Sequence, residues 1–455
     1  MLRQVPSVLR QQRSFAAAAS AAKYVDKNGR PNIVLVDAVR TPFVQSGTVF
    51  KDLMANDLQR SALLSLVDRT KVPISEVEHI ICGTVIQECR TSNIAREAAL
   101  TAGFPDNIPC NTVTLACISS NVAITNLMDS MAAGRTQCAI AGGVELLSDV
   151  PIRYNRKARK AMLAIQKAKT PMDRLKLGGE IIKNLLSPEL PAVAEFTSGE
   201  TMGQSGDRLA AAFGVSRREQ DDFALRSHTL ADKAQKEGHL NDVCPVFVGG
   251  KKALNVELDN GIRVSTPEKL GKLKPAFIKP HGTVTAGNAS YLTDGASAAL
   301  IMTEEYALKN GYKPKAYLRD YMYVAQDPKD QLLLGPAYGI PKILDRVGLT
   351  IKDIDVFEIH EAFAGQVLAN LNAMDSDFFC KNEMKRSGKF GRIPMEKINL
   401  WGGSLSLGHP FGATGVRLVS HSANRLKHEN GKFAVIGACA AGGHGVVQVI
   451  ENYSK

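Results

Sequence analysis

The chain alternates short apolar runs with longer stretches of helical periodicity. A short apolar run reads as a buried strand, and an amphipathic stretch reads as a helix that covers a sheet. Their alternation predicts a layered α/β architecture. The predicted strands lie at residues 33–36, 80–82, 138–141 and 300–302 in the first part of the chain, and at 356–359, 433–436 and 446–450 in the second.

An internal repeat predicts two similar halves. Segments 66–80 and 343–357 each read as a helix end with a hydrophobic-Asp-Arg pattern, a turn, and a strand at the same offset. A second similarity is found between the apolar runs at 138–143 and 433–438, each of which follows a helical stretch. We therefore expect an N-terminal half at residues 24–310 and a C-terminal half at 311–455.

The alternation lapses between about residues 144 and 275, where the repeat has no counterpart. This lapse predicts an inserted loop domain. Within it, Ser216 and Glu219 have the spacing of a capping box, which predicts a helix beginning there. The stretch 153–188 is predicted as short helices broken by Pro171 and by the glycine pair at 178–179.

Charge is concentrated in two segments of a chain of 455 residues with a net charge of +11. The first 23 residues are basic and acid-free, as in a mitochondrial transit peptide, with a disordered arm as the alternative. Residues 153–183 hold ten basic and two acidic side chains, and the remaining chain is nearly neutral. This distribution does not favour a nucleic-acid-binding surface.

The basic segment mixes its charges with apolar side chains, which favours a membrane interface and anionic lipid headgroups. A solvated insertion that steers an anionic substrate is the alternative. No uncharged apolar run reaches the length of a spanning helix. The candidate residues for lipid contact are Arg156, Lys157, Arg159 and Lys160.

Eight cysteines occur without the close pairs of a zinc site or a disulfide framework. We therefore expect a reducing compartment and no metal site. Two of them, Cys117 and Cys439, lie in segments of small residues, and His409 lies on a glycine-flanked turn before a predicted helix. Two thiols and an imidazole can divide nucleophilic attack and proton transfer between them.

Four segments together resemble the motifs of thiolases, in the order in which thiolases carry them. They are Gly-Thr-Val-Thr-Ala-Gly-Asn-Ala-Ser at 282–290, His-Glu-Ala-Phe-Ala at 360–364, the glycine-rich run 402–415 and Cys-Ala-Ala-Gly-Gly-His-Gly at 439–445. The resemblance runs from about Ile33 to the C-terminus. It implies a five-layered αβαβα sandwich and thiolytic cleavage of 3-ketoacyl-CoA, with CoA as co-substrate and no permanently bound cofactor.

The resemblance also implies roles for individual residues. Cys117 would be the nucleophile at the N-terminus of a helix, which favours the thiolate. His409 would take its proton, and Cys439 would carry protons to the acetyl-CoA enolate and from incoming CoA. Backbone N–H groups at Cys117, Ala441 and Gly442 would hold an oxyanion. Arg226 and Ser290 are the candidate CoA contacts.

Two departures from the usual thiolase pattern are informative. His360 stands where most thiolases have Asn, and an imidazole could replace or hold the water of that oxyanion hole. Ala441 stands where the family has the first glycine of its motif, which makes that backbone donor less certain. The variants resemble the thiolase (beta) subunits of trifunctional fatty-acid oxidation complexes in mitochondria.

That resemblance implies a homodimer of thiolase subunits, an alpha subunit with hydratase and dehydrogenase activities, and association with the matrix side of the inner membrane. Two other functions stay open on the same motifs. A ketoacyl synthase would catalyse condensation, although such enzymes have no second catalytic cysteine comparable to Cys439. A non-catalytic acyl-CoA carrier or scaffold subunit would have no need of the complete set of catalytic motifs.

Overall fold

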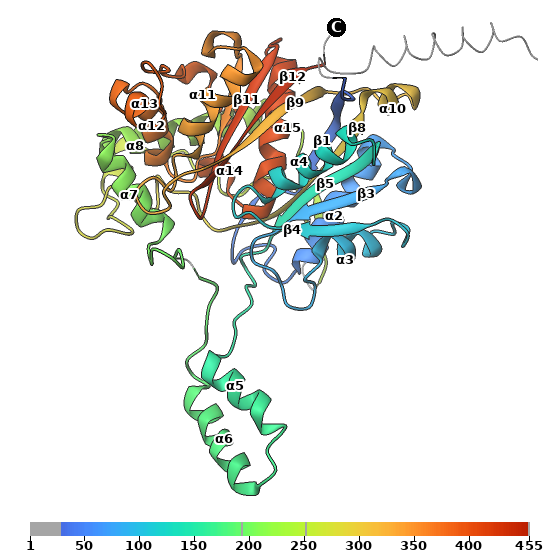
Figure 1. Cartoon of the computed structure of the whole chain (residues 1–455), viewed down its shortest axis with the longest axis vertical. Helices are drawn as coiled ribbons and strands as arrows, with labels where there is room; N and C mark the ends of the chain where they lie inside the picture. The colour runs from blue at the N-terminus through green and yellow to red at the C-terminus, as the bar shows by residue number, and fades with distance from the viewer. Residues whose placement is uncertain (1–28, 193, 251–252, 454–455) are drawn as a thin grey trace, which may run out of the picture.

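The computed structural model describes residues 29–192, 194–250 and 253–453 (Figure 1). The predicted transit peptide at residues 1–23 lies outside the described residues. The strands of the N-terminal half are β1 (Ile33–Arg40), β2 (Val44–Gln45), β3 (His79–Gly83), β4 (Cys110–Val113), β5 (Cys138–Glu145) and β8 (Thr293–Thr303). Those of the C-terminal half are β9 (Ala316–Ala325), β10 (Val356–Ile359), β11 (Phe433–Ala440) and β12 (His444–Asn452).

All seven predicted strands are present. The sequence pattern missed the short strand β2 and the strand pair Val246–Val248 and Leu254–Val256, and it also missed β4 and β9. Their residues explain the omission, because β4 reads Cys-Asn-Thr-Val and β9 carries Arg319 and Asp320 among its apolar positions. The strand order is β10-β11-β12-β9-β1-β8-β5-β3-β4, with β2 paired to β8. The two halves join where β1 and β9 pair through Val34 with Tyr317 and Leu35 with Ala316.

Helices form three layers around these strands, which confirms the predicted five-layered sandwich. Helices α4 (Ser119–Ala132) and α15 (Thr414–His428) pack against each other in the middle, where α4 contacts β3 and β5 and α15 contacts β10, β11 and β12. One outer layer contains α2 (Ala55–Thr70) and α3 (Ile94–Thr101). The other contains α11 (Gly335–Val347) and α12 (Ala364–Met374). Three large hydrophobic clusters fill the spaces between layers.

The predicted repeat corresponds to a repeated unit of structure. In the first half, α2 ends and a 3-10 turn (Ile74–Glu76) leads into β3. In the second, α11 ends and a 3-10 turn (Ile351–Asp353) leads into β10. The repeat could be recognised from the sequence because the helix end, the turn and the strand of each unit follow one another directly along the chain.

The segment between β5 and β8 contains, within the described residues, seven elements that have no counterpart in the repeat of the other half. They are α5 (Arg156–Ile165), α6 (Pro171–Asn184), α7 (Met202–Ala212), α8 (Arg217–Lys236), β6 (Val246–Val248), β7 (Leu254–Val256) and α9 (Pro267–Gly271). Ser216 and Glu219 form the capping box predicted for α8. The division of the chain at residues 310 and 311, with an insertion at about 144–275, stays a prediction.

Helices α5 and α6 form a hairpin that projects from the body of the molecule (Figure 1). The prediction that the glycine pair at 178–179 breaks a helix is wrong, because α6 continues through both glycines. Pro171 instead begins α6, where the missing N–H of proline costs nothing, and Thr170 caps the helix. Within the described ranges, no helix combines the length and apolar character needed to cross a membrane.

The remaining short elements lie in the C-terminal half and at its border. They are α10 (Glu304–Lys309), α13 (Asp377–Asn382), α14 (Ser404–Leu407) and the 3-10 turns Met395–Lys397 and Phe411–Ala413.

Candidate active site

Cys117 lies between β4 and α4, half-buried, at the N-terminal end of the helix. The preceding residue, Ala116, has a φ of 44°, which is the left-handed region that alanine seldom adopts. The Ser119 hydroxyl holds this tight turn by accepting from the Leu115 N–H at 2.8 Å and donating to the Ala116 carbonyl at 2.7 Å. The turn places Cys117 two residues before the first helical residue, Ser119.

Two histidines from the other half of the chain meet this cysteine. His360 follows β10, and His409 lies between α14 and α15. The Cys117 Sγ and one ring nitrogen of each histidine lie within 4.8 Å of one another. The two imidazole rings are 4.2 Å apart between centroids, and both are buried.

Cys439 completes the group from strand β11 and is 1% exposed. Burial raises the pKa of its thiol, and the neighbouring Cys117 raises that pKa further. The structure thus brings together the four residues predicted to be catalytic, although 322 positions separate Cys117 from Cys439.

Burial controls the protonation of the site. It raises the pKa of Cys117 to about 12, with the Glu145 carboxylate adding to the rise and the backbone N–H groups of Cys117 and Ala441 opposing it. Burial thus opposes the expected preference for the thiolate in the free protein, because desolvation favours the uncharged thiol. Burial also lowers the pKa of His360 to about 3 and that of His409 well below its usual value. A neutral His409 is free to take a proton.

The hydrogen bonds of the two histidines leave one nitrogen free on each ring. The Nδ1 of His360 lies 3.0 Å from the Ser404 Oγ, and the Nδ1 of His409 lies 2.7 Å from the Thr414 Oγ1. Within the described part of the chain, neither Nε2 has a hydrogen-bond partner, and both are buried. Because buried polar atoms are nearly always paired, these two nitrogens have the character of groups that await a ligand.

A second set of possible donors lies in the turn after β11. Ala441 does not have a positive φ, whereas Gly442 and Gly443 have φ values of 81° and 73°. Alanine is therefore compatible with its position, and the doubt raised by the missing glycine does not apply to the backbone. The Gly442 N–H donates to the Glu195 carboxylate at 3.0 Å, so Glu195 must leave before that N–H can bind a substrate oxygen.

Glycine permits close contact between the loops that carry these groups. A Cβ at Gly143, near the end of β5, would lie 1.9 Å from the Gly412 carbonyl oxygen. Glu145 fixes the same contact, because its carboxylate accepts from the Gly412 N–H at 3.0 Å and from the Ile86 N–H at 2.8 Å. Burial raises the pKa of Glu145 to about 7. These contacts set the position of the loop that begins at His409.

The candidate CoA residues have different surroundings. The Ser290 N–H donates to the Ala362 carbonyl at 2.9 Å, so Ser290 adjoins the loop that begins at His360. Arg226 donates to the carbonyl oxygens of Met395 and Ile398 at 2.6 and 2.7 Å. One of its terminal nitrogens is thereby committed to holding α8 against the C-terminal half. CoA contact by Ser290 and Arg226 stays a prediction.

Of the four lipid-contact candidates on the hairpin, Arg156, Lys157 and Lys160 are exposed on α5. Arg159 is half-buried and pairs with Glu189 at 2.6 Å. All four lie on α5, in the hairpin that projects from the body of the molecule (Figure 1).

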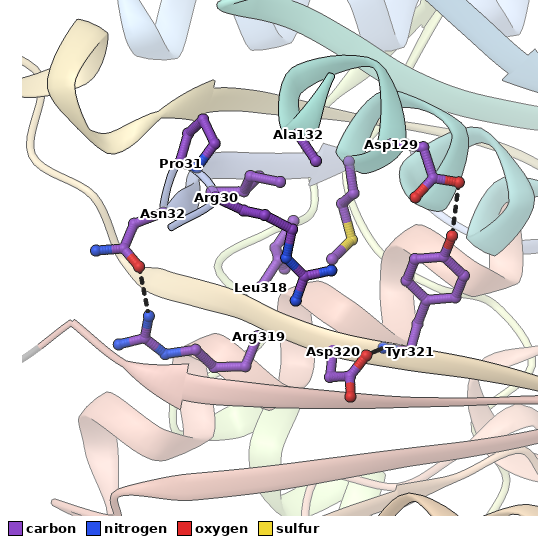
Figure 2. A pocket seen from close by; sticks show the side chains of 11 residues that line it. Arg30, Pro31, Asn32, Asp129, Ala132, Leu318, Arg319, Asp320 and Tyr321 are labelled. Atoms are coloured by element: carbon purple, nitrogen blue, oxygen red, sulfur yellow. Dashed lines mark hydrogen bonds between the residues drawn. The ribbon is translucent and has the colours of Figure 1, made fainter. Parts of the chain in front are cut away.

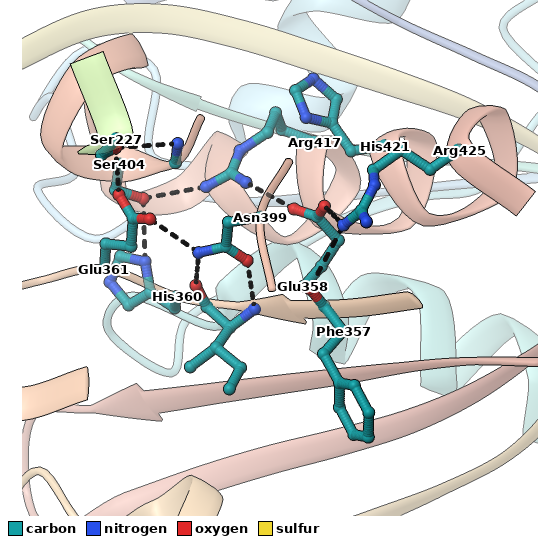
Figure 3. A network of polar contacts seen from close by, with 12 residues as sticks. Ser227, Phe357, Glu358, His360, Glu361, Asn399, Ser404, Arg417, His421 and Arg425 are labelled. Atoms are coloured by element: carbon teal, nitrogen blue, oxygen red, sulfur yellow. Dashed lines mark hydrogen bonds and ion pairs between the residues drawn. The ribbon is translucent and has the colours of Figure 1, made fainter. Parts of the chain in front are cut away.

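Sequence reasoning missed the residues that hold the histidines in place. Ser404 and Thr414 lie inside the glycine-rich run 402–415, so their position in the motif was a usable signal. Glu361 lies in the motif at 360–364 and had the same signal, whereas Arg417 lies outside both motifs and had none. Figure 3 shows Arg417 reaching Ser404 at 2.9 Å, and Glu361 held by Ser227 and Asn399 at 2.7 Å each.

Two of the hollows that lie outside the catalytic group border α4 or the loop before it. One lies between the start of β1, α4 and β9, where the Tyr321 hydroxyl donates to Asp129 at 2.6 Å (Figure 2). Neither cysteine and neither histidine of the candidate site lines it. The other is a cleft of about 540 Å³ where the hairpin stems meet the body beside Thr114, three residues before Cys117.

The spacing of Cys117, His360 and His409 would also suit a three-ligand metal site. The same nitrogens and sulfur suit acid–base and nucleophilic chemistry without a metal. The expectation of no metal stays a prediction.

Comparison with known proteins identifies relatives over nearly the whole chain. The family description "Thiolase, N-terminal domain" matches residues 33–305, and "Thiolase, C-terminal domain" matches residues 312–452. The chain is 74% identical to the probable 3-ketoacyl-CoA thiolase of Caenorhabditis elegans, over 98% of this chain and 100% of that protein. It is 61% identical to the mitochondrial trifunctional enzyme subunit beta of Bos taurus, over 97% and 93%.

A solved structure agrees with these relatives. The acetyl-CoA acetyltransferase of Bacillus anthracis superposes with a TM-score of 0.79 at 33% identity, covering 93% of this chain and 99% of that one. The similarity to this structure extends over 93% of the chain, and the two family descriptions match one half of the fold each. The chain belongs to the thiolase family.

Proposed function

We propose that this protein is a 3-ketoacyl-CoA thiolase of mitochondrial fatty-acid β-oxidation, an acyltransferase that uses CoA as co-substrate and binds no permanent cofactor. The observation that carries the proposal is the meeting of the Cys117 thiol with two neutral imidazoles and a second buried thiol. The relatives named as 3-ketoacyl-CoA thiolase and trifunctional enzyme subunit beta support the same activity.

The first half-reaction transfers an acyl group to Cys117. His409 takes the proton of the Cys117 thiol, and the sulfur forms a bond to the 3-keto carbon of the substrate. The oxyanion that develops there accepts hydrogen bonds from His360 and protonated His409. The bond between C2 and C3 then breaks, and the acetyl-CoA enolate takes the proton of Cys439.

The second half-reaction restores the enzyme. The Cys439 thiolate takes the proton of incoming CoA, whose sulfur attacks the Cys117 thioester. Backbone N–H groups of Cys117 and Ala441 hold the second oxyanion, since both lower the pKa of the Cys117 thiol in the free protein. Cys117 leaves as a thiolate and recovers its proton from His409. The raised pKa of Cys439 suits a group that must hold its proton until the enolate forms.

The test is thiolysis of a 3-ketoacyl-CoA by purified protein, with mass spectrometry of the protein after incubation with substrate alone. We expect acetyl-CoA, a shortened acyl-CoA and an acyl adduct on Cys117. An adduct on another cysteine would overturn the assignment of the nucleophile. Condensation without thiolysis would favour a ketoacyl synthase, and the absence of both reactions would favour a carrier or scaffold subunit.

The relatives also support proposals about partners. Because one of the compared relatives is named as a subunit of a trifunctional enzyme, we expect an alpha subunit that carries hydratase and dehydrogenase activities. We also expect a homodimer. Strand β4 supports this, because it is an edge strand paired only with β3 within the described ranges and can accept a strand from a second chain.

A second function of the chain is membrane contact by the α5–α6 hairpin, on the matrix side of the inner mitochondrial membrane. Exposed apolar side chains on and after α6 lie among the basic residues, with Leu175 72%, Ile182 73% and Leu186 92% exposed. On α5, Leu163 is 68% exposed. A hairpin with both features away from the body suits an interface of anionic headgroups and acyl chains.

The lipid proposal is tested by cosedimentation with cardiolipin-containing liposomes. Replacing Arg156, Lys157, Arg159 and Lys160 with Gln should weaken binding by roughly 1 kcal/mol per charge, and added salt should weaken the unmodified protein. The matched control removes four exposed lysines from the body, and it should bind almost as the parent does. Unchanged liposome binding with impaired CoA affinity would support electrostatic steering of substrate instead. The control lysines are Lys71, Lys309, Lys313 and Lys352.

A further inference from the structure

The two active-site histidines have similar surroundings but different hydrogen-bonding chains behind them. Each presents a free Nε2 to the site and contacts a hydroxyl through Nδ1. A neutral imidazole carries its proton on one nitrogen only, and the bond made by the other nitrogen decides which. A hydroxyl has a single proton, so its remaining partner determines whether it donates to the ring or accepts from it.

Behind His360, the hydroxyl is free to donate. The Arg417 Nη2 donates to the Ser404 Oγ at 2.9 Å (Figure 3). A guanidinium has no acceptor, so Ser404 cannot give its proton to Arg417. That proton is therefore available to the His360 Nδ1 at 3.0 Å, and the ring proton is left on Nε2.

Arg417 is itself fixed from behind. Its guanidinium is fully buried, and its Nη1 lies 3.5 Å from the buried Glu358 carboxylate. Glu358 also accepts from Arg425 at 2.8 Å. This buried ion cluster keeps Arg417 directed at Ser404, because breaking a buried pair would leave an uncompensated charge.

Behind His409, the hydroxyl has an acceptor. The Thr414 Oγ1 donates to the Pro410 carbonyl oxygen at 3.2 Å. Its proton is thereby engaged, so Thr414 accepts from the His409 Nδ1–H at 2.7 Å. The Nε2 of His409 is left with a lone pair that faces the site.

We propose that Ser404, through Arg417, and Thr414, through the Pro410 carbonyl, hold His360 and His409 in opposite tautomers. His360 is then a hydrogen-bond donor and His409 a proton acceptor at the Nε2 atoms that face Cys117. Ser404, Arg417 and Thr414 are positioning residues, since they act through the imidazoles. The inference rests on the proposed function only for the use made of these tautomers; the tautomers themselves are a property of the free protein.

Neutron diffraction from crystals of the unmodified protein, exchanged into deuterium oxide at pH 7.5, tests the tautomers directly. We expect deuterium on the His360 Nε2 and on the His409 Nδ1, and none on the other two ring nitrogens. Deuterium on the His360 Nδ1 or on the His409 Nε2 would overturn the proposal. The result does not depend on whether the protein catalyses thiolysis, so the two proposals can fail separately.

Two variants test what the tautomers do, because alkylation of Cys117 by iodoacetamide needs a base and no oxyanion donor. Thr414→Val removes the acceptor of the His409 Nδ1–H and should slow both alkylation and substrate acylation of Cys117, each about tenfold or more. Ser404→Ala removes the donor to His360 and should slow acylation about 10- to 100-fold while alkylation stays within about twofold.

Ser404→Thr and Thr414→Ser keep the hydroxyls and should restore the rates to within about threefold. If Ser404→Ala slows alkylation as much as acylation, or slows neither, the residue has no tautomer-specific role and the proposal is refuted. If a variant does not fold, the neutron result on the unmodified protein still decides the question.

Discussion

Gly143→Ala should disable the site by moving the loop that begins at His409. A Cβ at this position would lie 1.9 Å from the Gly412 carbonyl oxygen, whereas real Cβ atoms essentially never approach closer than 3.0 Å. The two backbones must therefore separate by about 1.1 Å. Gly412 is three residues from His409 and is tied to Glu145 by its N–H, so the displacement is transmitted to the base.

A misplacement of about 1 Å at a catalytic group costs roughly 100-fold in rate, or about 2.7 kcal/mol of activation free energy. Overpacking a buried site also lowers the free energy of unfolding by about 1–3 kcal/mol. We therefore expect kcat/KM for thiolysis to fall at least about 100-fold in protein that still folds. The assays are steady-state thiolysis of a short 3-ketoacyl-CoA and urea unfolding followed by circular dichroism.

Gly179→Ala is the matched control. Gly179 lies inside α6, where a Cβ would meet no atom within 4 Å. Alanine should leave thiolysis unchanged and favour the helix by about 0.5–1 kcal/mol. Wild-type thiolysis by Gly143→Ala would refute the argument, because it would show that the contact between Gly143 and Gly412 does not position the base.

The other predictions concern the site's chemistry. Cys117→Ala should lower the thiolysis rate by several orders of magnitude and abolish the acyl adduct while CoA binding persists, as mass spectrometry and calorimetry would show. Cys439→Ser should still acylate Cys117 but turn over slowly, because a serine hydroxyl is too weak an acid; near-normal steady-state thiolysis would exclude Cys439 as the proton carrier. Since the pKa of His360 is lowered from 6.5 to about 3, the unfolded chain binds a proton that the folded protein refuses between these values. The free energy of unfolding should therefore fall as pH drops from 6.5 toward 3, and it should fall less in His360→Asn. Urea unfolding at pH 7 and pH 5 measures this change for both proteins. An equal change in the two proteins would count against a buried neutral His360. Dialysis against a chelator should leave thiolysis intact, and loss of activity restored by a metal ion would assign a metal to the site.

The sequence determined the features that depend on local pattern. Apolar runs identified seven strands, and the repeated helix end, turn and strand identified two halves, because each unit spans few residues. The motifs around Cys117, His360, His409 and Cys439 identified the candidate chemistry. The capping box at Ser216 identified the start of α8 for the same local reason.

Strands without a clean apolar pattern could not be read in this way. Strand β4 contains polar residues at an edge of the sheet, and β9 carries charges at positions that the fold leaves half-buried. The glycine pair in α6 was misread because local propensity predicts a break, whereas packing of α6 against α5 favours a continuous helix.

Only the tertiary structure decided how the chemical groups act. A helix terminus favours the Cys117 thiolate, yet burial raises the pKa of the thiol, because desolvation depends on what the other half of the chain packs around it. The direction of the His360 imidazole depends on Ser404, which lies 44 positions away and is held by Arg417, whereas His409 is directed by Thr414 from the same loop. The sequence thus determined which residues could react, and packing within and between the two halves decided their protonation and geometry.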